Sequence, residues 1–256
     1  MTSNLISMVR DLQRRKGRKR RGLAIAEGIR IVEEALAAGV TMRGAIVTPG
    51  LDMTPRGAAL VANLAAHAVP MTDVSERQLV QLSDTDTPQG VLAVVEPPRW
   101  SLADIEPRAR APVLVLDSVQ DPGNVGTLLR TGAALGAVGA VMLKGTADLA
   151  NPKVIRAAMG ATFRFPTAPA DEAEFITWAA RQGLTVWATG IEGSPLARLT
   201  VPERLALVVG NEGAGVRPAL RSVAEHQVTL PLARGAESLN VAVATGIFLY
   251  EVTRAT

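Results

Sequence analysis

The sequence has no cysteine, few aromatic side chains and very little histidine. Its 256 residues include no cysteine, two histidines and 3% aromatic residues. Without thiols the protein has neither disulfides nor thiolate chemistry, and His67 and His226 are too few for a typical catalytic zinc site. We therefore expect no metal centre.

Long uncharged apolar runs are also missing. No run reaches the ~18 to 20 residues that a membrane helix needs, and the N-terminus lacks the apolar core of a signal peptide. Hydrophobic residues still make up 48% of the chain, enough to bury a core in one large domain or two ordinary ones. We expect a globular, soluble, cytoplasmic protein with no membrane partner.

The net charge of +3 hides a basic cluster near the N-terminus. Eight Lys/Arg and one acidic residue lie between Arg10 and Arg21, and the rest of the chain has 19 basic against 23 acidic residues. Such a cluster favours a nucleic-acid partner, because each neutralised phosphate releases counterions. A solvated basic helix, a frayed tail and a membrane-surface helix are the alternatives. The residues expected to bind are Arg14, Arg15, Lys16, Arg18, Lys19, Arg20 and Arg21.

Four prolines between Pro97 and Pro112 indicate a linker. We place it at 99–112, between a domain at 1–98 and a larger domain at 113–256. Hydrophobic periodicity predicts a small α/β domain before the linker. Its expected helices are 29–38 and 57–68, and its expected strands are 44–47 and 90–95.

After the linker, continuous apolar runs alternate with helical patterns, which predicts a parallel sheet covered on both faces. Ligands of such sheets bind at the carboxyl ends of the strands, so the following loops should carry the chemistry. The expected strands are 113–116, 140–143, 185–188 and 205–209, and the expected helices are 124–135 and 171–182.

Arg130 is the only charged residue between Val125 and Leu143, within an apolar helical pattern. We expect it to be buried and therefore to need an anion. The anion is either a carboxylate of the chain, such as Asp117 or Glu212, or a ligand in an active site.

Polar residues also mark the starts of two helices. Asp121-Pro122 is typical of an N-cap followed by proline in the first turn, and Asn124 follows closely. Ser238 and Asn240 precede the chargeless helical pattern 241–250. Asn124, Ser238 and Asn240 are therefore either helix caps or site residues.

Three glycines lie within 210–215, directly after an expected strand. They indicate a close approach of the backbone to a ligand, or only a glycine-rich turn. On the helix 241–250, Val241 and Ile247 are expected to face the core.

Taken in order, three motifs resemble those of the SpoU (TrmH) RNA methyltransferase family. They are 124–130, 211–215 and Ser238-Leu-Asn-Val-Ala-Val-Ala244. The N-terminal half resembles the ribosomal-protein-like substrate-binding domain attached to many members. The residues that carry this resemblance are the basic segment, 26–28, 33–36 and 87–90. The resemblance covers essentially the whole chain.

This resemblance implies a trefoil-knotted α/β catalytic domain that binds S-adenosylmethionine, works as a homodimer and methylates ribose 2′-hydroxyls of RNA. One small departure is Ala242, where several members have serine. By motif, the implied catalytic residues are Asn124, Arg130, Glu212, Ser238 and Asn240, and the implied cofactor-binding residues are Thr189, Gly190, Gly210, Leu230, Leu232, Leu239 and Ala244.

The target RNA is expected to be ribosomal, with transfer RNA as the alternative, because a separate N-terminal domain is present. A non-catalytic RNA-binding protein that assists ribosome assembly is a second reading of the basic segment. A nucleotide-dependent oxidoreductase is disfavoured because the dinucleotide fingerprint is missing. A serine hydrolase is disfavoured because Ser194 and Ser238 lie outside any G-x-S-x-G elbow.

Overall fold

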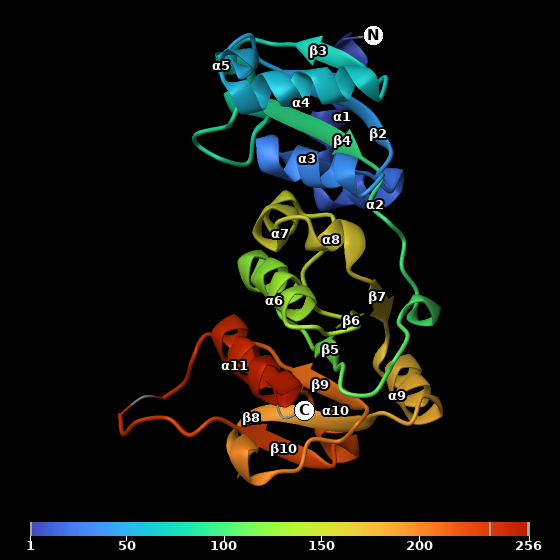
Figure 1. Ribbon diagram of the computed structural model, residues 1–256, viewed down its shortest axis with the longest axis vertical. Helices are drawn as coiled ribbons and strands as arrows, with labels where there is room; N and C mark the ends of the chain where they lie inside the picture. Colours follow the sequence, from blue (N-terminus) through green and yellow to red (C-terminus); the bar gives the residue numbers. More distant parts are fainter. Residues whose placement is uncertain (1, 236, 255–256) are drawn as a thin grey trace. The chain divides into compact units, whose positions relative to one another are not determined.

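The computed structural model describes residues 2–235 and 237–254. The chain forms two compact units (Figure 1). The first contains the chain up to Pro98 together with Asp148–Arg164, and the second contains Arg99–Ala147 together with the chain from Phe165 onward. Within the described residues, no helix is long and apolar enough to cross a membrane.

The first unit is built on a mixed four-stranded sheet in the order β1-β4-β2-β3. β4 is antiparallel to both its neighbours, whereas β2 and β3 are parallel. Alternate residues of the strands face opposite sides, so Ala93 of β4 joins one apolar core and Leu92 joins the other. The strands are β1 Ala24–Glu27, β2 Met42–Val47, β3 Met71–Asp73 and β4 Val91–Val95.

Helices cover both faces of this sheet. Residues of α3 and α4 pack in the core with Ala93, and residues of α1 and α5 pack in the core with Leu92. The short helix α5 starts with a capping box formed by Ser75 and Gln78. The helices are α1 Thr2–Leu12, α2 Arg15–Arg21, α3 Ile29–Ala37, α4 Pro55–Ala66 and α5 Glu76–Leu82, with a 3-10 turn η1 at Leu51–Met53.

The segment Asp148–Arg164 completes the first unit, although its sequence lies within the region expected to form the second domain. It contains α7 (Pro152–Ala158) and α8 (Ala161–Arg164). Ile155 and Phe163 are 1% and 3% exposed and belong to the same core as α3 and α4. The core of the first unit is therefore completed by a segment that begins about 50 residues after Pro98, where the rest of this unit ends.

The second unit contains a six-stranded sheet in the order β10-β8-β9-β5-β6-β7, parallel throughout. This confirms the α/β class and the parallel sheet predicted from the sequence. β7 and β10 were not predicted, since neither has an apolar run. The strands are β5 Val113–Leu116, β6 Gly139–Leu143, β7 Thr167–Ala170, β8 Thr185–Pro195, β9 Leu205–Val209 and β10 His226–Thr229.

Helices lie on both faces of this sheet as well. Phe175 and Leu220, from two different helices, share a core with Val113 and Val115 of β5. On the opposite face Leu114 approaches Gly132 of α6, and α6 packs against α11 (Figure 1). The helices are α6 Pro122–Ala134, α9 Glu172–Arg181, α10 Pro218–Val223 and α11 Val241–Arg254, with 3-10 turns η2 at Leu102–Asp104 and η3 at Leu196–Arg198.

A fully buried carboxylate joins the ends of two central strands. Asp117, directly after β5, has no exposed surface. Its side chain accepts hydrogen bonds from the backbone N–H of Arg217 at 2.8 Å and from Arg217 Nε at 2.5 Å. The ion pair closes the loop between β9 and α10 onto β5. Arg217 also lies 3.6 Å from Glu172.

Replacing Asp117 with alanine should destabilise the second unit. The substitution leaves the Arg217 guanidinium without its main counter-charge, and removing one partner of a buried pair costs about 3 kcal/mol. Chemical denaturation of Asp117→Ala should show this loss in the free energy of unfolding. The control Asp52→Ala removes an exposed carboxylate and should change stability little; equal stability of the two variants would contradict a structural role for Asp117.

Candidate active site

A cavity of about 610 Å³ lies beside the irregular part of β8 and the carboxyl ends of β9 and β10. Three segments line it, namely residues 189–191 of β8, the loop after β9 and the stretch from Thr229 into α11. This is the edge of a parallel sheet at which ligands bind. Every residue expected from the sequence to bind the cofactor lines this cavity, namely Thr189, Gly190, Gly210, Leu230, Leu232, Leu239 and Ala244.

An irregularity in β8 forms one wall. Ala188 pairs with Gln227 of β10, but the next paired residue of β8 is Ser194, which pairs with Val228. Residues 189–193 are therefore extra in β8, and they swing out of the ladder. Gly193 has φ 144°, and a Cβ there would lie 2.2 Å from the Gln227 carbonyl oxygen, so this bulge requires glycine.

The loop after β9 folds back on itself to form a second wall. The backbones of Asn211 and Gly215 exchange hydrogen bonds of 3.1 and 2.9 Å. A Cβ on Gly210 would lie 2.2 Å from the Gly215 carbonyl carbon. Closure of the loop therefore explains why position 210 needs glycine, without any ligand.

The side chain of Asn211 orders the same loop and was not among the expected site residues. Its Oδ1 accepts from the N–H groups of Gly213 and Ala214, and its Nδ2 donates to the Ser118 carbonyl at 2.9 Å. An asparagine next to glycines is a common turn-former, which is the signal that could have identified it.

Glu212 connects this loop to the start of α6. Its Oε1 accepts from Asn124 Nδ2 at 3.1 Å and from the Asp121 N–H at 3.2 Å. Its Oε2 accepts from the Gln120 N–H at 3.3 Å. Asp121 is the N-cap of α6, as predicted, and accepts from the Asn124 N–H at 2.8 Å.

Asn124 links Glu212 to the third motif, residues 238–244. Its Oδ1 accepts from Asn240 Nδ2 at 3.0 Å. Asn240 Oδ1 in turn accepts from the N–H groups of Ala242 and Val243 at the start of α11. Asn240 thus caps α11 and also lines the cavity, and the structure brings together all three motifs of the sequence. Ser238 also lines the cavity.

These contacts set the ionisation of Glu212. Partial burial by itself would raise the pKa of the carboxyl, but hydrogen bonds from Asn124 and from the backbone N–H groups of Glu212, Gln120 and Asp121 outweigh it. The pKa therefore lies below the ordinary value of 4.5. At neutral pH Glu212 is a carboxylate held by N–H donors, which makes it an anchor and a weak proton acceptor.

The expectation that Arg130 is buried is wrong. The apolar side of α6 consists of Val125, Leu128 and Leu129, and Arg130 lies on the exposed side. Neither suggested carboxylate pairs with it, because Asp117 binds Arg217 and Glu212 accepts from N–H groups. Within residues 2–235 and 237–254, Arg130 makes no hydrogen bond or ion pair. Its guanidinium is free to meet a ligand.

The expected core position of Ile247 is also wrong, since this side chain is 41% exposed. Val241 is half-buried. The buried side of α11 consists instead of Ala242, Thr245, Phe248, Leu249 and Val252.

One residue of the basic cluster is buried and does not present its charge to RNA phosphates. Arg18 is only 6% exposed, and it donates from Nε to Asp148 at 2.9 Å and from Nη1 to the carbonyls of Leu12 and Gln13. Arg18 therefore stabilises the first unit. The remaining expected residues are exposed, and two of them, Arg20 and Arg21, pair with Asp11.

Glu212→Gln should loosen the site at neutral pH. A glutamine places an amide N–H₂ against N–H donors, so about 1 kcal/mol of stability should be lost, a value kept low by partial exposure. Because the folded pKa is lowered, this contribution is present above the ordinary pKa and is lost as pH falls through the folded value. Thermal unfolding should thus give a lower melting temperature for the variant than for the wild type at neutral pH. This difference in melting temperature should shrink below about pH 4.5.

The matched control for this measurement is Glu203→Gln, in which an exposed carboxylate changes. The control should unfold like the wild type throughout the range. A wild-type-like Glu212→Gln at neutral pH would contradict the anchoring role.

Two family models match the chain. The SpoU rRNA Methylase family matches residues 111–250, and the MRM3-like substrate binding domain matches residues 4–93. The 23S rRNA (guanosine(2553)-2'-O)-methyltransferase RlmP of Bacillus subtilis is 35% identical over 95% of this chain and 93% of its own length.

Solved structures agree with this match. The AdoMet-bound rRNA methyltransferase from Sinorhizobium meliloti superposes with a TM-score of 0.88 and 32% identity, covering 99% of this chain and 95% of that one. The SpoU methyltransferase AviRb from Streptomyces viridochromogenes, in complex with AdoMet, gives 0.87 and 27%, covering 96% and 95%. The family suggested by the three motifs is therefore confirmed, and the chain belongs to the SpoU rRNA methylase family.

Proposed function

We propose that this protein transfers a methyl group from S-adenosylmethionine to a ribose 2′-hydroxyl of 23S ribosomal RNA. The observation that carries the proposal is the meeting of Asn124, Glu212 and Asn240 beside a cavity at the carboxyl edge of the sheet. The names of the relatives support the substrate, because the B. subtilis relative acts on 23S rRNA.

The cavity suits S-adenosylmethionine in size and lining. Its volume of about 610 Å³ falls within the range of small-molecule sites, about 300–1,000 Å³. Leucines 230, 232 and 239 offer apolar surface for an adenine, and Thr189, Gly190, Gly210 and Ala244 bring backbone and small side chains close. When bound, S-adenosylmethionine supplies a methyl group on a positively charged sulfur.

Arg130 is the residue we assign to the RNA at the reacting centre. A guanidinium is a poor proton acceptor, so we do not assign Arg130 as a general base. It can grip a phosphate next to the target ribose with two parallel N–H donors and stabilise negative charge developing on the 2′-oxygen. Its exposure and its lack of a partner in the described chain fit this role.

The other polar residues position the participants. Glu212 holds the start of α6, and Asn124 and Asn240 hold α6 and α11 together. Ser238 lies at the cavity wall, where its hydroxyl can orient the ribose. Methyl transfer by direct displacement needs such positioning and no covalent enzyme intermediate.

The first unit binds the RNA backbone in this proposal. Arg14, Arg15, Lys16 and Lys19 are exposed on or beside α2 and can neutralise phosphates. Arg20 and Arg21 can contribute once they exchange Asp11 for phosphate. A ribosomal RNA substrate would place the protein in the cytoplasm.

A homodimer is the second part of the proposal. Val243, Ile247 and Tyr250 of α11 are 54%, 41% and 52% exposed. Their spacing puts them on one side of the helix, so they form an apolar stripe. A second copy of the chain would cover this stripe. The trefoil knot implied by the family stays a prediction.

Arg130→Ala should lose methyl transfer without losing cofactor binding. Removing a donor that stabilises developing charge typically costs 10²–10³ in rate, and we expect a loss of about that size. The assay measures transfer of radiolabel from S-adenosylmethionine to ribosomal and transfer RNA from a strain that lacks the protein, with calorimetry of cofactor binding in parallel. Label that resists alkaline cleavage identifies a 2′-O-methyl group.

Two further variants sharpen this test. Arg130→Lys should also lose most turnover, since an ammonium cannot grip a phosphate with two parallel donors. Arg181→Ala removes an exposed arginine of α9 and should leave turnover unchanged. Nearly full activity of Arg130→Lys would argue against the gripping role, and wild-type protein without cofactor binding would overturn the enzyme assignment.

Ile247→Glu should convert the dimer to a monomer. A carboxylate at the centre of the apolar stripe would be buried without a partner in the dimer. Light scattering of wild type and variant measures the change, and Val80→Glu, at an exposed apolar position of α5, serves as the control. A monomeric wild type at working concentration would refute the dimer.

A further inference from the structure

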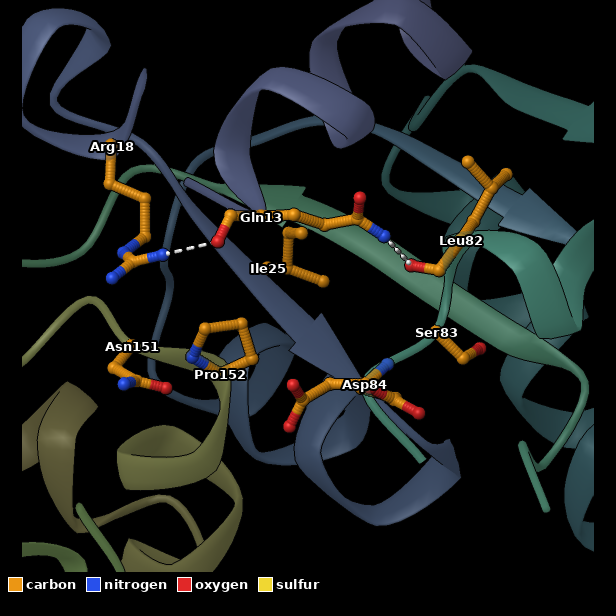
Figure 2. A pocket seen from close by; sticks show the side chains of 9 residues that line it. Gln13, Arg18, Ile25, Leu82, Ser83, Asp84, Asn151 and Pro152 are labelled. Atoms are coloured by element: carbon orange, nitrogen blue, oxygen red, sulfur yellow. Dashed lines mark hydrogen bonds between the residues drawn. The ribbon is translucent and has the colours of Figure 1, made fainter. Parts of the chain in front are cut away.

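A second cavity lies within the first unit. Its volume is about 310 Å³, about half that of the cavity in the second unit. The wall comes from the link between α1 and α2, from α2, from β1, from the turn after α5 and from the start of α7 (Figure 2). The residues that line it are Gln13, Arg18, Ile25, Glu27, Leu82, Ser83, Asp84, Asn151 and Pro152.

Part of this wall is apolar and rigid. Ile25 and Leu82 are each 2% exposed, and Pro152 is buried at the first position of α7. These three side chains close the floor of the cavity and leave a small aliphatic patch for the edge of a ligand. The described wall contains no aromatic ring.

Arg18 is held in place at the side of the cavity. Three hydrogen bonds, to Asp148 and to the carbonyls of Leu12 and Gln13, use its Nε and Nη1. Neighbouring Gly17 permits this packing, because a Cβ there would lie 2.0 Å from the Asp11 carbonyl oxygen. Nη2 makes no hydrogen bond within the described chain, so the guanidinium is a pre-oriented donor.

Other polar groups of the wall also keep free bonding capacity. Asn151 Oδ1 accepts from the Lys153 N–H, which leaves its Nδ2 as a second donor. Asp84 Oδ2 accepts from Arg156 Nη2 at 3.1 Å, which leaves Oδ1 as an acceptor. Figure 2 shows Arg18 and Asn151 on one side and Asp84 on the other. The lining thus contains donors on Arg18 and Asn151 and an acceptor on Asp84.

The geometry points to a binding site for one unstacked nucleobase of the RNA substrate, a base that carries an exocyclic amino group. The amino group donates to Asp84 Oδ1, the carbonyl or ring nitrogen beside it accepts from Arg18 or Asn151, and the edge of the ring packs on the aliphatic patch. This inference rests on the proposed function, since the RNA substrate supplies the base.

The remaining acceptor favours a base over a phosphate here. Glu27 is buried, where it accepts from the Asp84 N–H and the Thr85 hydroxyl. Arg156 lies 3.5 Å from Glu27 and 3.1 Å from Asp84, which balances both carboxylates. The second Asp84 oxygen can only accept, so it suits a base amino group and offers nothing to a phosphate oxygen. The exposed cations beside Arg18 in sequence, Lys16 and Lys19, can hold the flanking phosphates.

The test compares cytosine, which carries an amino group, with uracil, which has a carbonyl instead. Full-length protein is titrated into labelled oligocytidylate or oligouridylate of about ten nucleotides, within the site size of single-strand binders, and anisotropy gives the affinities. We expect wild type to bind oligocytidylate about tenfold more tightly. Asp84→Asn, which has the same shape, should reduce this preference to less than about twofold, because its amide presents a donor to the base amino group.

Two matched variants complete the design. Asp86→Asn makes the same charge change two residues away, outside the cavity wall, and should keep the preference. Ser83→Leu fills the cavity and should abolish the preference, whereas Gln81→Leu, at an exposed position, should not. With ribosomal RNA as substrate, Asp84→Asn should raise KM about tenfold and leave kcat unchanged.

Equal binding of both oligonucleotides by wild type, or an unchanged preference in Asp84→Asn, would overturn the base site. Methyl transfer by the same protein samples separates this result from the proposed function. If wild type methylates ribosomal RNA but shows no preference, only the base site fails. If wild type methylates no RNA, the methyltransferase assignment fails, and the oligonucleotide preference still decides the base site.

Discussion

The candidate active site of the second unit depends on one carboxylate with several N–H donors. Glu212 lies 88 residues from Asn124 in the sequence, and Asn124 lies 116 residues from Asn240. Hydrogen bonds of 3.1 and 3.0 Å join these three positions, and each bond fixes the start of a helix or the end of a strand. Because the Asn211 loop is stabilised by its own contacts, Glu212 is presented from a rigid turn. The cavity beside it is therefore shaped before any ligand arrives.

In the first unit, hydrogen bonds hold a buried cation instead of a carboxylate. Arg18 is a cation inside a cluster of like cations, yet it is buried, because Asp148 and two carbonyls satisfy it. Asp148 belongs to a segment that lies in sequence between β6 and β7, strands of the second unit. The same segment supplies Ile155 and Phe163 to the core of the first unit. A chain cut at residue 98 would thus expose apolar core and leave Arg18 without its counter-charge.

Local patterns were enough to predict the apolar strands and the caps. Continuous runs such as 113–116 and 205–209 identified β5 and β9 to the residue, and Asp121 was identified as a cap. Short strands such as β10, with mixed side chains, carry no such signal. Exposure of Arg130 was missed because the other exposed residues of α6, Thr127, Ala133 and Ala134, are small and uncharged. The burial of Arg18 depends on Asp148, a contact between residues 130 apart that no local pattern contains.

The ionisation of the site groups limits how the reaction can be promoted. Glu212 has a lowered pKa, and both of its carboxylate oxygens accept hydrogen bonds from N–H donors. It is therefore poorly suited to take the proton of a ribose hydroxyl. A guanidinium is a poor proton acceptor, so neither Arg130 nor Glu212 is suited to act as the base. These two residues and the asparagines therefore act by holding the 2′-oxygen in line with the methyl group and by stabilising its developing charge, which explains why so many site contacts fix the loops.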